Sequence, residues 1–308
     1  MGYFTNNNYL THGFYLGYKW VKPKGIYNNI YFNLNGAYIE RFEPRMYQEF
    51  RLNGNLNGQL KNLWQIGVYG DYRQEKNDFY EARVAGWMVR QPSSWMKGFR
   101  VASNSNKKFA GSIQVYHRQS AQYNTSNLEV SAANSFRFND RLSIGLSHFM
   151  EFHNRNFGFA AISENADSVF MSLRRIRTSE NVFNVKYNFT NMMGITLRIR
   201  HYWSKVKYFD YMHLQQDGTV KPVASIGSNP DINVNLFNVD MNYTWQFAPG
   251  SFINVTWKTA SELYDNLVME RYSRNLDKAV ESPSYNSFSV KIIYFLDYLT
   301  IKARKARG

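Results

Sequence analysis

The sequence of 308 residues lacks several features that define common classes of protein. It contains no cysteine, which excludes disulfide bonds and thiolate metal sites. It contains no apolar run near the roughly 20 residues that a transmembrane helix requires, which excludes a helical membrane protein. Its first residues carry no basic stretch followed by an apolar one, so no signal peptide is recognisable.

Catalytic motifs are missing as well. The six histidines show no His-Glu-x-x-His spacing, and neither a Gly-x-Ser-x-Gly elbow nor a phosphate-binding Gly-Lys-Ser/Thr loop occurs. His148 and His153 are five residues apart in the sequence, which places them on opposite faces of an extended strand. Five carboxylates fall between residues 262 and 281, but the sequence places no two of them at the separation that a glycosidase requires. We therefore expect no enzyme active site, no metal and no cofactor.

Aromatic residues, by contrast, are abundant. They make up 17% of the chain, with 23 Tyr, 23 Phe and 7 Trp, although the mean hydropathy of −0.51 is clearly polar. A transmembrane β-barrel reconciles the two observations, because its strands turn an apolar face to lipid and a polar face to water. Girdles of Tyr and Trp at both membrane interfaces account for the aromatic content.

The charge is unbalanced, with 37 Lys and Arg against 23 Asp and Glu and a formal net charge of +14 at pH 7. Such a protein either binds nucleic acid through a cationic patch or carries cations scattered over the lumen and loops of a barrel. Only residues 174–177 and 302–307 form basic clusters, and most other cations are dispersed along alternating segments. The dispersal favours the barrel, and we expect no nucleic-acid partner.

Apolar and polar residues alternate over long stretches, which is the pattern of a β-strand with two different faces. In the clearest stretch, residues 236–247, the apolar face carries Phe237, Val239, Met241, Tyr243, Trp245 and Phe247. The polar face carries Asn238, Asp240, Asn242, Thr244 and Gln246. After a turn at residues 248–250 the alternation resumes over residues 253–258, so the two segments are expected to form a hairpin.

Further segments repeat this pattern, at residues 50–56, 142–147, 183–189, 195–200 and 288–298. We expect roughly 14–16 strands of about ten residues each, longer than the 5–6 residues usual in a soluble sandwich. Short turns are expected near residues 23–25, 139–140, 191 and 249–250. Long polar loops are expected at residues 205–233 and 261–284, and no helical spacing is sustained anywhere. Between residues 73 and 105 the strand count conflicts with up-and-down parity by one.

The second half of the chain resembles a known family. The resemblance is carried by residues 198–204 (RIRHYWS), 237–251 (FNVDMNYTWQFAPGS) and 286–298 (NSFSVKIIYFLDY), and more weakly by residues 77–83 and 92–95. These segments resemble the outer-membrane β-barrel domain of unknown function that follows a family-9-like carbohydrate-binding module in Gram-negative surface proteins. The resemblance implies a link to glycans. It also implies that a sugar-binding module and a signal peptide precede this segment in a longer protein.

Charged side chains on the polar faces form the first group of functional candidates. On neighbouring strands we expect the following to point into the lumen: Lys186, Arg198, Arg200, Asp240 and Lys258. They form either an electropositive constriction that prefers anionic solutes or a cross-strand charge ladder that stabilises the lumen. The carboxylate of Asp240 offers the cations a partner, which favours the ladder.

Aromatic side chains in the two long loops form the second group. They are Tyr208, Phe209, Tyr211, Tyr264 and Tyr272. Aromatic rings stack on the apolar faces of sugars, so these residues are candidates for glycan contact. The alternative, which we favour, is that the loops pack on themselves above the mouth of the barrel.

The sequence thus predicts an all-β protein, a transmembrane antiparallel up-and-down β-barrel that spans residues 1–308 as one domain of a bacterial outer membrane. In lipid only a closed sheet lets strands pair all their backbone groups. We expect the barrel to anchor a glycan-binding surface protein and to serve as its conduit, with outer-membrane lipid and glycans as partners. Two other classes remain open: an outer-membrane carbohydrate hydrolase, and a soluble basic β protein that binds nucleic acid.

Overall fold

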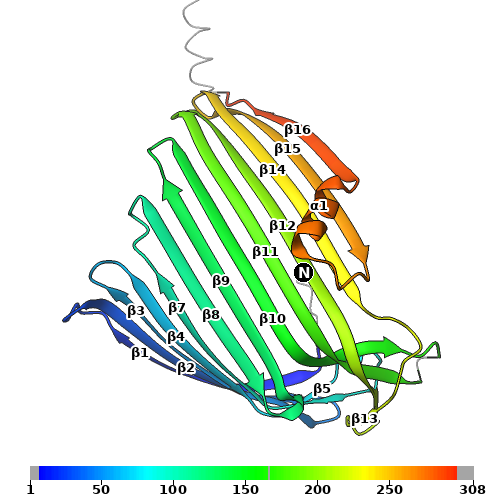
Figure 1. Cartoon of the computed structure of the whole chain (residues 1–308). Helices are drawn as coiled ribbons and strands as arrows, with labels where there is room; N and C mark the ends of the chain where they lie inside the picture. Colours follow the sequence, from blue (N-terminus) through cyan, green and yellow to red (C-terminus); the bar gives the residue numbers. More distant parts are fainter. Residues whose placement is uncertain (1–6, 166, 297–308) are drawn as a thin grey trace, which may run out of the picture.

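One antiparallel sheet dominates the computed structural model, which describes residues 7–165 and 167–296 (Figure 1). Fourteen strands form the sheet: 13 lie side by side in chain order, and the fourteenth, β13, pairs with β12 alone. The strands of the sheet are β1 (Tyr9–Trp20), β2 (Tyr27–Arg41), β3 (Met46–Leu60), β4 (Gln65–Arg73), β7 (Ser94–Ala102), β8 (Phe109–Ser120), β9 (Thr125–Arg137), β10 (Leu142–Ile162), β11 (Val169–Thr190), β12 (Met193–Leu214), β13 (Val220–Pro222), β14 (Ile232–Ala248), β15 (Ser251–Asp265) and β16 (Ser284–Ile293). The other elements are the hairpin β5 (Lys76–Asp78) and β6 (Val89–Gln91), the short helix η1 (Gln122–Asn124) and the helix α1 (Tyr272–Glu281). The all-β antiparallel prediction is confirmed.

The register of the strands separates apolar and polar side chains onto two sides of the sheet. One row across β12, β14, β15 and β16 reads Leu197, Met241, Trp257 and Phe288. The next row reads Thr196, Asn242, Thr256 and Ser289. Successive side chains of a strand point to opposite faces, so the first row lies on an apolar face and the second on a polar one.

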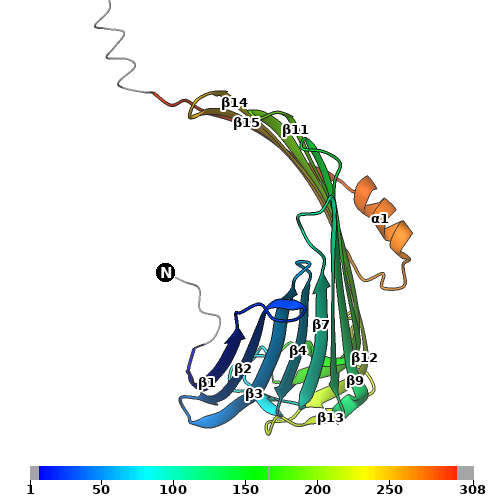
Figure 2. The same cartoon turned by 90° about the vertical axis from the view of Figure 1, so that its left-hand side faces the viewer.

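The sheet is strongly curved, and Figure 2 shows it as an open arc with α1 on its convex side. The helix contacts Asn233 and Asn235, which share a face of β14 with Phe237 and Val239. The apolar face is therefore the convex one, and the polar face lines the concave side. This is the arrangement that a barrel wall requires when lipid lies outside and water inside.

The two ends of the strands differ as the sequence predicts. The expected turns at residues 139–140, 191 and 249–250 all lie at the same end of the strands. Gly250 there takes the positive φ of 71° that a tight turn needs. The parity conflict is resolved as well, because β4 pairs directly with β7 while β5 and β6 form a separate two-stranded sheet. The intervening residues 74–93 are called the insert below.

The predicted long loops are shorter than expected. Strand β12 continues to Leu214 and β15 continues to Asp265, so residues 205–214 and 261–265 are strand rather than loop. Within the second loop the chain forms α1, whose buried side chains are Asn275 and Ala279. The expectation that no segment is helical is therefore wrong. The apolar residues Tyr272, Leu276, Ala279 and Val280 have the spacing of one helix face, so this short helix was recognisable from the sequence.

The arc is not closed among the described residues. Strand β1 pairs only with β2, and β16 pairs only with β15. Because 13 antiparallel strands follow one another, the first and the last run in the same direction. Residue Tyr298 and the basic residues 302–307 lie outside the described residues. No helix in the described part of the chain is long and apolar enough to cross a membrane.

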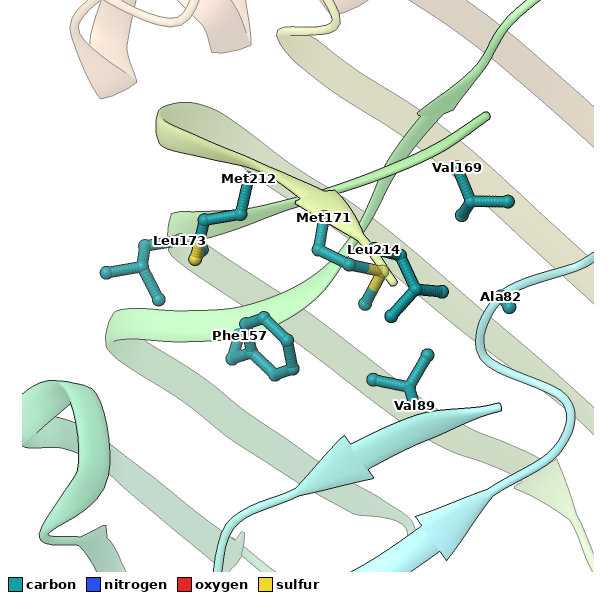
Figure 3. Packing of buried hydrophobic residues seen from close by; sticks show 8 residues of the cluster. All are labelled: Ala82, Val89, Phe157, Val169, Met171, Leu173, Met212 and Leu214. Carbon is teal, nitrogen blue, oxygen red and sulfur yellow. The ribbon is translucent and has the colours of Figure 1, made fainter. Parts of the chain in front are cut away.

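A small hydrophobic core lies at the end of the sheet opposite the short turns (Figure 3). Its members come from the insert and from the extended ends of β10, β11 and β12: Ala82, Val89, Phe157, Val169, Met171, Leu173, Met212 and Leu214. The insert also touches the first strands, since Phe79 lies under the guanidinium of Arg41. A segment that reaches both β2 and β10–β12 must cross the concave side of the arc. The insert therefore spans the end of the arc opposite the short turns, and this end is called the mouth below.

Candidate functional site

The predicted luminal charges lie together on the concave face. Arg198, Asp240 and Lys258 are direct cross-strand neighbours on β12, β14 and β15. The ammonium nitrogen of Lys258 lies 3.9 Å from a carboxylate oxygen of Asp240, and both side chains are substantially exposed. With Lys186 they border a hollow of about 690 Å³. Arg200 lies on the same face but pairs with Glu180 instead, at 2.8 Å.

A second polar pocket of about 350 Å³ lies at the mouth, between the insert and strands β4 and β7–β11. Its cationic side chains are Arg73, Lys76, Arg118 and Arg174, and its acidic ones are Asp78 and Glu81. This pocket could not be predicted from the sequence, because the insert that completes it is separated from Arg118 and Arg174 by many residues.

The charges in this mouth pocket are only partly neutralised. Asp71, which is almost fully buried, accepts hydrogen bonds from both Arg73 and Arg118. Arg174 donates to the side-chain oxygen of Asn156 at 2.6 and 3.0 Å, and no carboxylate of the described chain lies within ion-pair distance of it. The pocket therefore retains positive charge.

The carboxylate of Asp78 in the insert is held in the charged form. Burial alone would raise the pKa of Asp78, but the ammonium group of Lys76 and hydrogen bonds from Lys76 and the backbone N–H groups of Tyr80 and Glu81 outweigh it. The pKa of Asp78 is therefore lowered, and its carboxylate remains ionised beside the pocket.

Two polar atoms at the mouth pocket have no hydrogen-bond partner within the described residues. They are the hydroxyl oxygen of Ser120, a residue only 8% exposed, and the amide oxygen of Asn127. Buried polar atoms are normally satisfied, so such atoms favour a polar occupant. Cations together with free hydroxyl and amide groups suit a small solute that carries both a negative charge and hydroxyl groups.

The aromatic candidates do not form one surface. Tyr208 and Phe209 are adjacent residues of β12 and point to opposite faces, and Tyr211 follows in the same strand. Tyr264 lies near the end of β15 and is 64% exposed. Their assignment to loops is therefore wrong, because the strands run further than their polar composition indicates.

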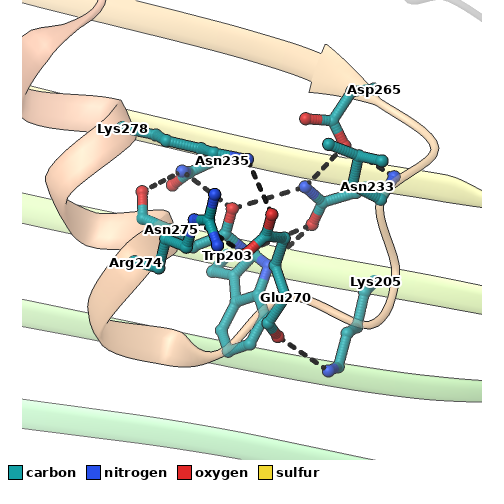
Figure 4. Close-up of polar contacts among 10 residues, drawn as sticks. Trp203, Lys205, Asn233, Asn235, Asp265, Glu270, Arg274, Asn275 and Lys278 are labelled. Carbon is teal, nitrogen blue, oxygen red and sulfur yellow. Dashed lines mark hydrogen bonds and ion pairs between the residues drawn. The ribbon is translucent and has the colours of Figure 1, made fainter.

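The side chain of Tyr272, the first residue of α1, lies between the helix and the sheet. Its hydroxyl accepts a hydrogen bond from Asn181 at 2.7 Å and lies 3.0 Å from His201. Neighbouring contacts extend this network, since Trp203 donates to Asn233 at 2.7 Å and Asn235 donates to Asn275 of α1 (Figure 4). The network fixes the helix to the convex face rather than presenting Tyr272 to a ligand.

No metal site is evident in residues 7–165 and 167–296, where no three His, Asp or Glu side chains are grouped closely enough to hold an ion.

The family of the chain follows from its similarity to known sequences. The model of a family described as a domain of unknown function, DUF5916, matches residues 1–305. The chain belongs to the DUF5916 family. No curated protein matches this DUF5916 chain.

A solved structure described as the NanC porin is similar to the DUF5916 chain at 8% sequence identity. The match covers 92% of this chain and 99% of the porin chain, with a TM-score of 0.27.

Removing the carboxylate of Asp240 from the concave face of the sheet should change the charge of that face more than the stability of the protein. Asp240→Ala is expected to cost less than about 1 kcal/mol, because exposed ion pairs contribute little. It should shift the reversal potential toward anions in planar-bilayer recordings, since Arg198 and Lys258 lose their shared counter-charge. Unchanged selectivity together with a large loss of stability would instead identify a structural charge ladder.

Proposed function

We propose that this chain forms the wall of an outer-membrane β-barrel whose concave face lines an aqueous passage. One observation carries the proposal: in a single sheet of 13 consecutive antiparallel strands, β12 and β14–β16 carry apolar side chains on the convex face and polar side chains on the concave face, away from the insert. The apolar stretch of β10, residues 142–152, is interrupted on its convex face by His148 and has about the length that a tilted membrane strand requires. A soluble protein would cover such a face with a second layer, whereas α1 covers only one end of it.

The free edges require closure in lipid, because unpaired backbone groups are costly there. Since β1 and β16 run in the same direction, pairing them directly would create a parallel pair. Antiparallel closure requires an odd number of further strands between them. We propose that the barrel closes in one of these two ways.

The passage is proposed to favour small anions that carry hydroxyl groups. The cations of the mouth pocket and the Arg198–Asp240–Lys258 row both support this selectivity. In this proposal the chain itself catalyses no reaction. It anchors and supplies a conduit for a surface protein that binds glycans, a role that the family-9-like resemblance implies.

The absence of cysteine makes a direct test possible. Met241→Cys and Asn242→Cys place one thiol on the convex and one on the concave side of the same strand. In cells or vesicles, a membrane-impermeant, water-soluble maleimide should label the variant at 242 and not the one at 241. A lipid-soluble maleimide should show the reverse preference.

Equal labelling of both thiols by the water-soluble reagent would exclude a lipid-facing convex side. A chain that stays soluble without detergent would do the same, and would revive the nucleic-acid alternative. Hydrolysis of a glycan by the purified chain would contradict the non-enzymatic part of the proposal alone.

A further inference from the structure

Four cations project together from the convex face near the mouth: Arg175, Arg177, Lys205 and Lys207. Arg175 lies directly opposite Lys207, and Arg177 lies directly opposite Lys205, on β11 and β12. The register between these strands runs without a shift from here to Phe183 and Ile199. The four side chains therefore leave the sheet on the same apolar side as those two residues. We call them the convex cation cluster.

Among the residues that the structure describes, the cluster has no counter-charge. Like charges directly opposite one another destabilise a sheet, so two such pairs in succession call for compensation. No carboxylate of the described residues lies within 4.0 Å of any of the four. The nearby acids are engaged elsewhere: Asp210 pairs with Arg155 at 3.4 Å, and Glu270 pairs with Lys278 at 3.0 Å and Arg274 at 3.5 Å.

The neutral contacts of the cluster do not supply the missing charge. Arg177 donates to the backbone oxygen of His153 at 3.1 Å and to the side-chain oxygen of Asn154 at 2.9 Å. Lys205 reaches only the backbone oxygen of Glu270, at 3.4 Å (Figure 4). Arg175 and Lys207 are exposed. An anion at this place would meet two flexible, exposed cations beside two that are already held in position.

The cluster borders the apolar band of the convex face. Phe152, the last residue of the apolar stretch of β10, lies opposite Arg177, and its ring centre is 5.2 Å from the guanidinium. The ring of Trp203, which is buried beneath α1, lies 4.9 Å from the ammonium of Lys205. The half-buried ring of Phe152, beside a cation at the end of a lipid-facing stretch, is typical of the level at which lipid headgroups lie.

We infer that the convex cation cluster binds the phosphate groups of membrane lipids. Guanidinium groups match phosphate oxygens with paired hydrogen bonds, and basic clusters beside a membrane surface attract anionic headgroups. A lipid phosphate would neutralise both like-charged pairs while its acyl chains cover the apolar band below. The inference rests on the proposed membrane location, and it adds a ligand on the outer side of the wall.

The test uses the protein folded in a zwitterionic detergent and titrated with phosphatidic acid or phosphatidylcholine, with bound lipid counted by native mass spectrometry. Phosphatidic acid should bind at least about tenfold more tightly than phosphatidylcholine. R175Q/K207Q should remove part of this preference, and R175Q/R177Q/K205Q/K207Q should remove nearly all of it. A control with four exposed lysines neutralised at the other edge, K22Q/K24Q/K107Q/K108Q, should keep the preference.

Folding can be separated from binding. Without lipid phosphate the quadruple variant should be at least as heat-resistant as the parent, because two like-charged pairs are removed. An unchanged preference for phosphatidic acid in the quadruple variant overturns the inference. Displacement of the lipid by inorganic phosphate at the same concentration also overturns it, since the cluster would then bind free anions. The thiol-labelling experiment does not involve these residues, so a failure of the membrane proposal is recognised independently.

Discussion

Replacing Met241 with Arg should lower the free energy of unfolding in a bilayer by about 2–4 kcal/mol, the cost of a lipid-facing cation near the middle of a barrel wall. Met241 lies in the centre of the apolar face of β14, between Leu197 and Trp257 on the adjacent strands. An arginine there has no polar neighbour in its row and must either enter hydrocarbon or distort the lipid around it. Unfolding by urea from phosphatidylcholine vesicles measures the change.

The matched control is Asn242→Arg, one residue further along the same strand. Asn242 lies on the concave face between Thr196 and Thr256, where water hydrates a cation. Both variants add the same charge at nearly the same depth, so their difference isolates the face to which the side chain points. Similar costs for the two variants would contradict the assignment of lipid to the convex side.

The faces of the sheet could be predicted from sequence because the period of two is a local property of each strand. The apolar set of residues 237–247 lies on one face as expected, and so do its partners on β12 and β15. Register between strands follows from the same pattern, since a slip of one residue would reverse the face of a whole strand. This explains why Arg198, Asp240 and Lys258 could be expected to be neighbours.

The ends of the strands could not be predicted in this way. Beyond the apolar band both faces of β10–β12 meet water or the insert, so the alternation stops although the strands continue. Residues 205–214 therefore looked like a loop. The register also shifts between Ser172 and Leu173 and between His153 and Asn156, which breaks the period of two there.

The mouth pocket was missed for a different reason. Its residues become neighbours only when the insert crosses the concave side and packs on β10–β12. That contact depends on a few apolar residues such as Ala82 and Val89, which form no periodic pattern. Helix α1 differs, because Tyr272, Leu276, Ala279 and Val280 do have helical spacing, so the helix was predictable from the sequence.

Leu214→Ala should loosen the mouth without affecting the membrane wall. The side chain of Leu214 is fully buried in the core that joins the insert to the ends of β11 and β12. Truncating such a leucine costs about 2–5 kcal/mol, because the lost contacts leave a cavity. We expect faster hydrogen exchange in residues 76–91, together with unchanged migration of the unheated protein on a gel. Leu146→Ala is the control: Leu146 is 52% exposed on the convex face, so lipid can fill the space and the cost should be small.

A deletion tests whether the insert, which this core fixes to the strand ends, narrows the proposed passage. Arg73 and Ser94 are directly paired, so a tight turn can replace residues 74–93 without changing the sheet. If the insert narrows the passage, its removal should raise single-channel conductance, because the segment that completes the mouth pocket is lost. Leu214→Ala should raise the conductance as well, but less strongly. Unchanged conductance in the deletion variant would mean that the insert stabilises the strand ends without controlling the passage.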